Sequence, residues 1–236
     1  RAHADELVRN DPFSAEGRAK VGGAVGALFG YLDGLVDERL AEPRDDMITA
    51  LTHAEIDGER LERGELLGFC FLLLVAGTET TTNLLGNALV ALHRHPEARR
   101  RLEQDPTLTA AAVGEVLRFE SPVQVLGRTS TTAVELGGVE IPADTQVLMV
   151  FGAANRDDAE FDRAERFDID RRPDRHLAFG HGVHHCLGAA LARMEGRVGL
   201  DELLRRSPRL EVLDDDVAWM PSGLIRGPAH LAVTVT

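Results

Sequence analysis

The chain has 236 residues, room for one large domain or two small ones, and its 44% hydrophobic and 28% charged residues exclude a disordered or fibrous protein. Its 26 Lys and Arg residues against 39 Asp and Glu residues give a formal net charge of −13, which argues against nucleic acid or an anionic membrane as a partner. Two widely separated cysteines exclude a disulfide framework, and the longest uncharged apolar run, 66–77, is too short to span a bilayer. Residues 1–10 show no secretory signal, so we expect a cytoplasmic protein.

Helical patterns dominate the first half of the chain. Apolar residues recur at helical spacing from Ala15 to Leu40, and a shorter helix is expected from Asp45 to Glu55. A long helix follows from about Leu61 to Leu92, roughly 45 Å if it is unbroken, and His95–Pro96 ends it. Two further helices are expected, Pro96–Gln104 and Thr109–Phe119.

The pattern changes from residue 121 onward. Short strands are expected where β-branched and apolar residues alternate between Gly and Pro signals, and residues 153–186 are expected to be irregular. The fold class we predict is α+β and predominantly α-helical, with one more long helix. The expected strands are Val123–Leu126, Arg128–Leu136, Gln146–Val150, Leu210–Leu213 and His230–Thr236, and the last helix is Leu187–Arg206.

A lone carboxylate marks the middle of the long helix. Glu79 is the only charged residue between positions 66 and 92, and it stands among threonines that include Thr80. Burying a carboxylate is costly unless it is paired, and Gly77 leaves space beside it for a bulky group. The pattern is typical of a site that moves protons next to a bound group. The alternative is that Glu79 lies on a solvent-facing stripe.

A second feature is the Glu115-x-x-Arg118 spacing. It places opposite charges on one helix face, one turn apart. Most such pairs are solvated and contribute little, so the pair gains weight only from its position between the long helix and the strands.

The most informative stretch runs from Phe179 to Gly188 and ends in Cys186-Leu187-Gly188. Its glycines, Gly180 among them, let the backbone take positive φ and let a flat group approach closely. Cys186 directly precedes a predicted helix, whose N-terminus favours a thiolate. The pattern predicts a single-cysteine metal ligand.

Zinc is the competing interpretation of this stretch. Four histidines and one cysteine crowd into residues 176–186, but adjacent side chains do not easily point at one tetrahedral ion. A buried structural cysteine is a further alternative. The candidate zinc ligands are His176, His181, His184, His185 and Cys186.

Together, the Ala76-Gly77-Thr78-Glu79-Thr80 segment, Glu115-x-x-Arg118 and Phe179-x-x-Gly182-x-x-x-Cys186-x-Gly188 resemble the cytochrome P450 family in its soluble bacterial form. The resemblance covers nearly the whole chain and implies a single P450-like domain over residues 1–236. Complete family members carry a further N-terminal portion, so we expect this chain to be the C-terminal part of such a domain.

The resemblance implies a role for each matching residue. Cys186 corresponds to the axial thiolate on the iron of haem b, and Thr80 and Glu79 to the pair that delivers protons to dioxygen. Glu115 and Arg118 correspond to a buried structural pair that is completed by Arg166. The other implied haem-binding residues are Ala76, Gly77, Arg128, Phe179, Gly180, His184 and Gly188.

The resemblance also implies a function, a haem-thiolate monooxygenase that takes O₂ and receives electrons from NAD(P)H through a ferredoxin-type carrier. A basic face for that carrier is expected from Arg94 and Arg99–Arg101, together with Arg193 and Arg197 on the last helix. The alternative is that these arginines form an ordinary solvated helix face. Alternatives are a peroxide-dependent haem-thiolate enzyme, a haem-free fragment or binding module, and a zinc-binding domain. An apolar substrate is expected to meet Leu73, Val123, Gln124, Val125, Leu126 and Leu224, the last in the Ser222–Ile225 turn.

Overall fold

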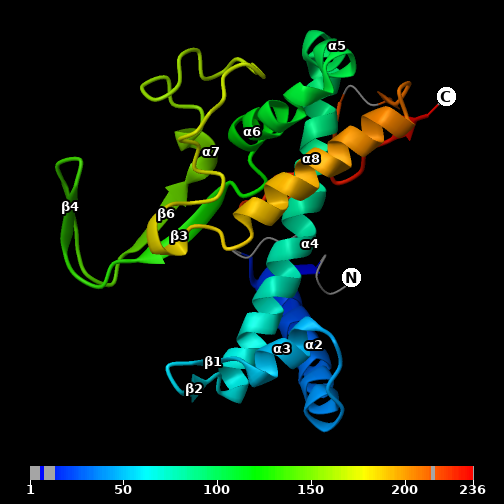
Figure 1. Ribbon diagram of the computed structural model, residues 1–236. Helices are drawn as coiled ribbons and strands as arrows, with labels where there is room; N and C mark the ends of the chain where they lie inside the picture. The colour runs from blue at the N-terminus through cyan, green and yellow to red at the C-terminus, as the bar shows by residue number, and fades with distance from the viewer. Residues whose placement is uncertain (1–5, 8–13, 214–215, 236) are drawn as a thin grey trace. The chain divides into compact units, whose positions relative to one another are not determined.

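The computed structural model describes residues 6–7, 14–213 and 216–235, so parts of the predicted 1–10 segment and of the last strand lie outside the described residues. The chain divides into two compact units, Arg1–Glu79 and Thr80–Thr236, which are described separately (Figure 1). The single-domain interpretation of residues 1–236 stays a prediction.

The first unit is built from helices that begin at polar caps. The N–H of Gly17 donates to Ser14 Oγ at the start of α2 (Ala15–Ala41), and the N–H of Thr49 donates to Asp46 Oδ1 at the start of α3 (Met47–His53). The first part of α4 (Arg63–Arg94) completes this unit. Its core consists of Leu32, Val36, Leu66 and Cys70.

A small hairpin precedes α4 and was not expected from the sequence. Strand β1 (Glu55–Ile56) pairs antiparallel with β2 (Glu59–Arg60). The turn between them has φ of 53° at Asp57 and 85° at Gly58, the left-handed conformation that an Asp-Gly turn adopts readily. The Asp-Gly dipeptide was therefore the sequence signal for this hairpin.

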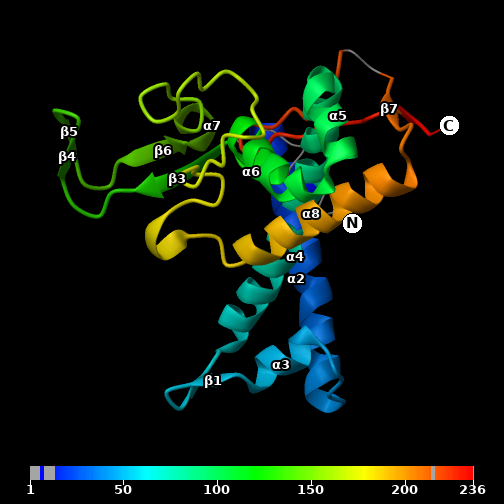
Figure 2. The same ribbon diagram turned by 45° about the horizontal axis from the view of Figure 1, so that its top comes forward.

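The second unit packs helices around one core. The rest of α4 leads into α5 (Pro96–Gln104), a 3₁₀ turn η1 (Pro106–Leu108) and α6 (Thr109–Phe119), and α8 (Ala189–Arg206) packs against α6 (Figure 2). A Cβ at Gly196 would lie 2.9 Å from Leu84 and 3.1 Å from Val113, so only glycine lets α8 approach this closely. Buried residues of this core include Leu84, Ala88, Leu92, Val113, Val116, Leu117 and Leu200.

Among the described residues of the second unit, the strands form three two-stranded antiparallel sheets. Strand β3 (Val125–Thr129) pairs with β6 (Gln146–Val150), and β7 (Glu211–Val212) pairs with β8 (Val233–Thr234). The strand expected at Arg128–Leu136 is wrong as one element, because β3 ends at residue 129. A separate β4 (Val134–Leu136) then turns at Gly137 and Gly138 into β5 (Val139–Ile141).

The helix boundaries agree closely with the sequence predictions, and the predominantly helical α+β fold is confirmed. The long helix, expected from about Leu61, is α4 at Arg63–Arg94. Residues 155–181 hold no helix or strand; the short α7 (Phe151–Ala154) precedes them and the 3₁₀ turn η2 (Gly182–His184) follows.

Helix α4 is the one described helix long and apolar enough to cross a membrane, by length and composition only. The core helix of a globular protein passes the same test, and within the second unit α4 buries Leu84, Ala88 and Leu92 in the core. One such helix is weak support for a membrane span.

Candidate functional site

The Cys186 thiol is exposed on a short, tightly turned loop. The N–H of Cys186 donates to the carbonyl of Phe179 at 2.9 Å, and the intervening residues turn with φ of 68° at Gly180 and 69° at Gly182. A Cβ on Gly180 would lie 3.5 Å from the carbonyl oxygen of His184, so the constraint there is conformational rather than steric. The backbone fixes the position of the sulfur while leaving one side of it open.

The final helix begins later than expected. Its N-cap is Gly188 and its first helical residue is Ala189, so the start at Leu187 is wrong by two residues. The N–H of Ala189 donates to the carbonyl of Cys186 at 3.2 Å, which keeps the cysteine next to the first turn of α8. Val183 (98% exposed) and Leu187 (81%) place open apolar side chains on either side of it.

Phe179 lies between the loop and α8. Its ring is half-buried against the core of the second unit, and the guanidinium of Arg193 stands 4.4 Å from the ring centroid. The imidazole of His176 is buried, and its centroid lies 5.8 Å from that of the same ring. Burial, together with the charges of Arg193 and Arg118, lowers the pKa of His176 to about 4, although Asp174 opposes the shift.

The Glu115-x-x-Arg118 pair is fully buried. Arg118 donates from Nε to Glu115 Oε2 at 2.9 Å and from a terminal nitrogen to Oε1 at 2.8 Å, a bidentate pair in which both side chains have no exposed surface. Arg118 also donates to the carbonyls of Asn155 (2.7 Å) and Ala164 (2.8 Å). The pair therefore holds the irregular segment that precedes the Cys186 loop.

The third member of this cluster is not the side chain of Arg166. Arg166 contributes its backbone carbonyl, which accepts from Arg118 at 3.1 Å, while its own side chain is exposed. The second guanidinium at Glu115 belongs to Arg171, whose Nε lies 3.3 Å from Oε1. Arg166 and Arg171 both lie in the same irregular segment, and the sequence pattern does not show which of the two side chains turns toward Glu115.

Asn155 connects the cluster to the cysteine loop, and sequence reasoning missed it. Its carbonyl accepts from Arg118, its Nδ2 donates to Ser121 Oγ at 2.8 Å, and its Oδ1 accepts from the N–H of Leu177 at 2.6 Å. The carbonyl of Leu177 accepts in turn from the N–H of Gly180 at 2.9 Å. A continuous chain of hydrogen bonds thus runs from the buried arginine to the turn that presents the sulfur. The sequence signal for this role was an asparagine inside a segment expected to be irregular.

The predicted acid and alcohol lie on α4 at the boundary of the two units. Glu79 (8% exposed) is buried within the chain, which excludes the solvent-facing alternative, and Thr80 is half-buried. Thr78 Oγ1 donates to the carbonyl of Leu74 at 3.0 Å, a bond from a mid-helix hydroxyl to the carbonyl four residues earlier. Ala76 and Gly77 are exposed, and a Cβ on Gly77 would meet nothing within 4 Å.

The remaining predicted haem-binding residues lie on two elements of the second unit. Arg128 lies on β3 opposite Val147, and its guanidinium donates to the carbonyl of Gly127 at 2.8 Å. His184 is exposed at the end of η2, four residues before Gly188, the N-cap of α8.

The structure joins the two segments expected to face the substrate. Val123 and Ile225 form an isolated antiparallel bridge, and the N–H of Gln124 donates to the carbonyl of Leu224 at 2.8 Å. The side chain of Gln124 donates from Nε2 to the carbonyl of Ser121 at 2.6 Å. Leu73, on the part of α4 that belongs to the first unit, is half-buried.

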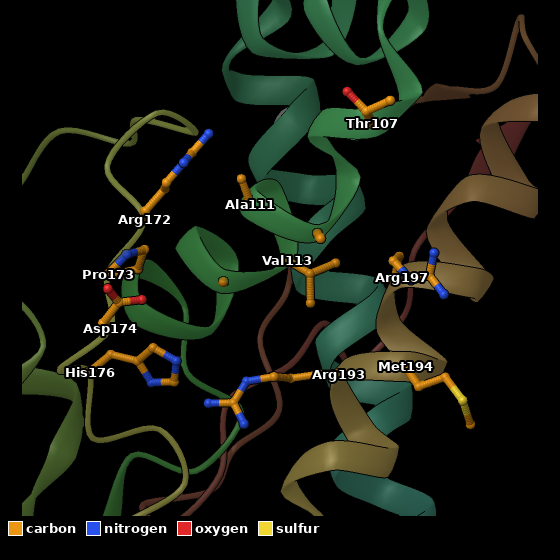
Figure 3. Close-up of a pocket in the computed structure, with 12 residues that line it drawn as sticks. Thr107, Ala111, Val113, Arg172, Pro173, Asp174, His176, Arg193, Met194 and Arg197 are labelled. Atoms are coloured by element: carbon orange, nitrogen blue, oxygen red, sulfur yellow. The ribbon is translucent and has the colours of Figure 1, made fainter.

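A broad hollow of about 560 Å³ lies between α6, residues 172–176 and α8 (Figure 3). Arg193 and His176 extend toward each other across it, and Arg172, Arg197 and Asp174 line its rim. Three arginines against one aspartate make this surface basic on a chain whose net charge is −13.

The donor set fits a cofactor that requires one protein ligand. Among the described residues no group of three or more His, Cys, Asp or Glu side chains is gathered to hold a metal ion, which argues against the zinc interpretation. A haem iron takes a single axial thiolate, and its macrocycle needs a flat apolar surface. The exposed sulfur of Cys186, with Val183 and Leu187 beside it, meets both requirements.

Comparison with known proteins identifies the family. Residues 9–218 match cytochrome P450. This chain belongs to the cytochrome P450 family. The P450 assignment rests on most of the chain's length and not on the cysteine loop alone.

Two bacterial relatives illustrate the match. The chain is 43% identical over 236 residues to cytochrome P450 107B1 of Saccharopolyspora erythraea, and 42% identical over 216 residues to a vitamin D(3) 25-hydroxylase of Pseudonocardia autotrophica. These alignments cover 99% and 90% of this chain but 57% and 54% of the relatives. The chain thus spans about half the length of the curated relatives it matches.

Solved P450 structures share the fold. Cytochrome P450 CYP109Q5 from Chondromyces apiculatus superposes with a TM-score of 0.87 at 42% identity, over 99% of this chain and 58% of that one. P450BioI, solved in complex with an acyl carrier protein carrying hexadec-9Z-enoic acid, superposes with a TM-score of 0.92 at 35% identity, over 100% of this chain and 61% of that one.

Proposed function

We propose that this protein is a haem-thiolate monooxygenase that inserts one oxygen atom of O₂ into an apolar organic substrate. The observation that carries the proposal is the single exposed thiol of Cys186, fixed by the backbone of a glycine-rich loop in a chain of the P450 family. The overall reaction consumes the substrate, O₂, two electrons and two protons, and it yields the hydroxylated product and water.

When bound, haem b supplies an iron centre that binds and reduces dioxygen, and its thiolate ligand donates electron density that favours O–O cleavage. Cys186 provides that ligand. The bond from its N–H to Phe179 and the positive φ of Gly180 and Gly182 orient the sulfur. The ring of Phe179 would help to screen the thiolate from water once haem covers its open side.

Thr80 and Glu79 hold and move the protons that the reaction consumes. A buried carboxyl group beside a half-buried hydroxyl can exchange protons with a group bound next to the helix, because the carboxyl accepts when ionised and donates when protonated, and the hydroxyl does both. Ala76 and Gly77 carry too little side chain to obstruct a flat group.

Arg128 and His184 would bind the two haem propionates. A guanidinium and an imidazole form charge-assisted hydrogen bonds with carboxylates, and these two side chains come from a strand and from the cysteine loop. Gly188 lets the backbone at the start of α8 lie close to the macrocycle, since a Cβ there would meet nothing within 4 Å.

We propose an apolar substrate that contacts Leu73, Val123 and the Leu224 turn. The backbone bonds between residues 123–125 and Leu224 place two of these segments side by side. A relative named vitamin D(3) 25-hydroxylase, and P450BioI solved with a fatty acyl chain, support an apolar substrate class.

Electrons would come from NAD(P)H through a ferredoxin-type carrier that docks on the basic hollow. Arg193 links the hollow to the loop because its guanidinium stacks on Phe179, whose carbonyl accepts from Cys186. A basic concavity on an acidic protein attracts an acidic carrier and accelerates association at low salt. Such carriers and their reductases act in the cytoplasm, where we expect this protein.

The deciding experiment is the absorbance of the reduced protein with carbon monoxide. The unchanged protein and a Cys70→Ala control should give the red-shifted thiolate-haem band, whereas Cys186→Ala should lose it, because only the exposed cysteine can reach an iron. A thiolate-haem band that persists in Cys186→Ala would refute the ligand assignment, and bound zinc without haem would revive the zinc alternative.

A second measurement tests the proton role. Thr80→Ala should consume reduced carrier at a rate close to that of the unchanged protein but form less product per electron pair, with peroxide released instead. Thr82→Ala, an exposed threonine on the same helix, is the matched control. Equal coupling in the two variants would remove Thr80 from the proton path, and turnover by peroxide alone would identify the peroxide-dependent enzyme.

A further inference from the structure

The two segments assigned to the substrate wall, 122–126 and 222–226, form one backbone-bonded unit. Besides the bond from Gln124 to Leu224, the N–H of Arg226 donates to the carbonyl of Pro122 at 2.8 Å. The N–H of Val125 also reaches the carbonyl of Leu224, at 3.3 Å. Neither segment can therefore shift toward or away from α4 without moving the other.

Asn87 fastens both segments to α4. Its Nδ2 donates to the carbonyl of Glu120 at 2.8 Å and to the carbonyl of Arg226 at 3.0 Å. Glu120 immediately precedes the first segment and Arg226 closes the second. The side chain of Asn87 is fully buried, so water does not compete for these two bonds.

Side chains of Glu120, Arg156 and Arg226, called the strap below, connect the same two segments. Arg226 Nε donates to Glu120 Oε2 at 2.5 Å, and the guanidinium stacks 3.7 Å from the centroid of Trp219. Arg156 reaches the other carboxylate oxygen of Glu120 at 3.7 Å and donates to the carbonyl of Phe119 at 2.6 Å. The strap joins the end of α6, the irregular segment and the 222–226 turn at one point.

Stability alone does not explain an asparagine at position 87. Its Oδ1 has no hydrogen-bond partner among the described residues, and a buried carbonyl without a partner is unfavourable. What the amide provides is a pair of donors aimed at two different segments. That arrangement fixes the distance between α4 and the substrate wall.

We propose that Asn87 is a positioning residue that sets how far the wall formed by residues 122–126 and 222–226 stands from the Thr80 face of α4. Thr80 precedes Asn87 by two helical turns, about 10 Å along the axis, so both act on the same helix. The assignment of the wall to substrate rests on the proposed function, whereas the fastening of the wall by Asn87 does not.

The first test needs no haem. Hydrogen exchange is compared between Asn87→Ala and Asn83→Ala, two identical truncations one turn apart on α4. The first removes the two bonds to the wall, whereas the Nδ2 of Asn83 has no partner among the described residues. Asn87→Ala should accelerate exchange at the amides of Gln124 and Arg226 on the order of tenfold or more, with little change in α8. Equal acceleration in both variants would overturn the proposal.

The second test uses imidazole and 4-phenylimidazole as iron-binding probes of the haem-loaded protein. Imidazole is small, whereas the phenyl group of the larger probe must fit between the iron and the wall. Asn87→Ala should change the ratio of the two Kd values at least threefold and leave the carbon monoxide spectrum unaltered. An unchanged ratio would overturn the link between Asn87 and the substrate wall.

The outcomes separate this inference from the proposed function. Absence of haem from the unchanged protein would contradict the proposed function, and the exchange comparison would still decide whether Asn87 fastens the wall. If Asn87→Ala does not fold, Asn87→Leu replaces it, because Leu keeps a similar volume while removing both donors. That variant should accelerate exchange at Gln124 and Arg226 several-fold, and unaltered exchange there would overturn the proposal.

Discussion

The Glu115–Arg118 cluster and the Cys186 loop are both recognisable as short sequence motifs, yet the structure treats them in opposite ways. The Glu115 and Arg118 side chains have no exposed surface, and a bidentate pair, backbone carbonyls and a second arginine satisfy their charges. The loop leaves its sulfur and neighbouring side chains open, and only backbone bonds shape it. A buried charge pair must be complete for the fold to hold, whereas a ligand loop must stay accessible for its chemistry.

Hydrogen bonds nevertheless connect the two regions. Arg118 binds the carbonyl of Asn155, the amide of Asn155 binds Leu177, and Leu177 bonds to the turn at Gly180. The cluster is therefore the foundation that positions the loop. Changes in the cluster should act strongly on both folding and the site, while changes in the loop should act mainly on the site.

The largest effect is expected at Arg118. Arg118→Leu leaves the Glu115 carboxylate buried without its main partner and should lower the free energy of unfolding by about 3–5 kcal/mol, measured by urea denaturation. Arg166→Leu is the matched control, because Arg166 takes part through its backbone carbonyl and its side chain is exposed, so its effect should stay within about 0.5 kcal/mol. Equal losses in the two variants would contradict the assignment of Arg171 over Arg166.

That contrast shows what the sequence could and could not predict about the cluster. The i, i+3 spacing of Glu115 and Arg118 fixes their proximity on a helix, so the pair was predictable. The third arginine lies some fifty residues away in a segment with no helix or strand, where neither periodicity nor spacing determines which side chain turns inward. Arg171 and Asn155 needed the structure.

The next effect concerns His176, which stands between the two regions. Its pKa is lowered to about 4, chiefly by burial and then by Arg193 and Arg118, so the folded protein holds it neutral. Its Nδ1 accepts from the N–H of Ala178 at 3.2 Å, a bond that the protonated ring would lose. Protonation of this side chain therefore favours the unfolded chain.

The free energy of unfolding should therefore fall as the pH is lowered. Between pH 6.5 and pH 4 the unfolded chain binds a proton at this histidine and the folded chain does not, so this contribution is complete above pH 6.5 and is lost as the pH falls toward 4. The loss should reach about 3 kcal/mol in urea titrations at a series of pH values. His176→Gln should flatten the curve in that window, and a curve of unchanged slope would contradict the buried neutral state.

The fold itself was largely predictable because its helices carry strong local signals. Periodic apolar residues, Pro96 at a first helical position and the length of the apolar run fixed α2, α4, α5 and α6 to within a few residues. Pairing between distant segments was not predictable in this way. The bonds between residues 122–126 and 222–226 depend on how the end of the chain returns to α4, which no local pattern encodes.

A smaller effect is expected at the turn of the loop. Gly180→Ala forces a Cβ onto a residue with φ of 68°, which should cost about 1–2 kcal/mol of stability. Gly188→Ala, at a φ of −84° with open space around the Cβ, should cost less. If Gly180→Ala is as stable as Gly188→Ala, the left-handed turn is not required for the loop.

The smallest effect on stability is expected at Cys186, whose sulfur is the proposed iron ligand. Cys186→Ser changes an exposed side chain that holds no described hydrogen bond through its sulfur, so the haem-free chain should keep its free energy of unfolding within about 0.5 kcal/mol. Cys70→Ser instead places a hydroxyl in the apolar core formed with Leu32, Val36 and Leu66, and it should destabilise by about 1–3 kcal/mol. A comparable loss of unfolding free energy at both positions would mean that Cys186 supports the fold as Cys70 does. The Cys186 loop would then not be an open ligand loop that differs from the buried Glu115–Arg118 cluster.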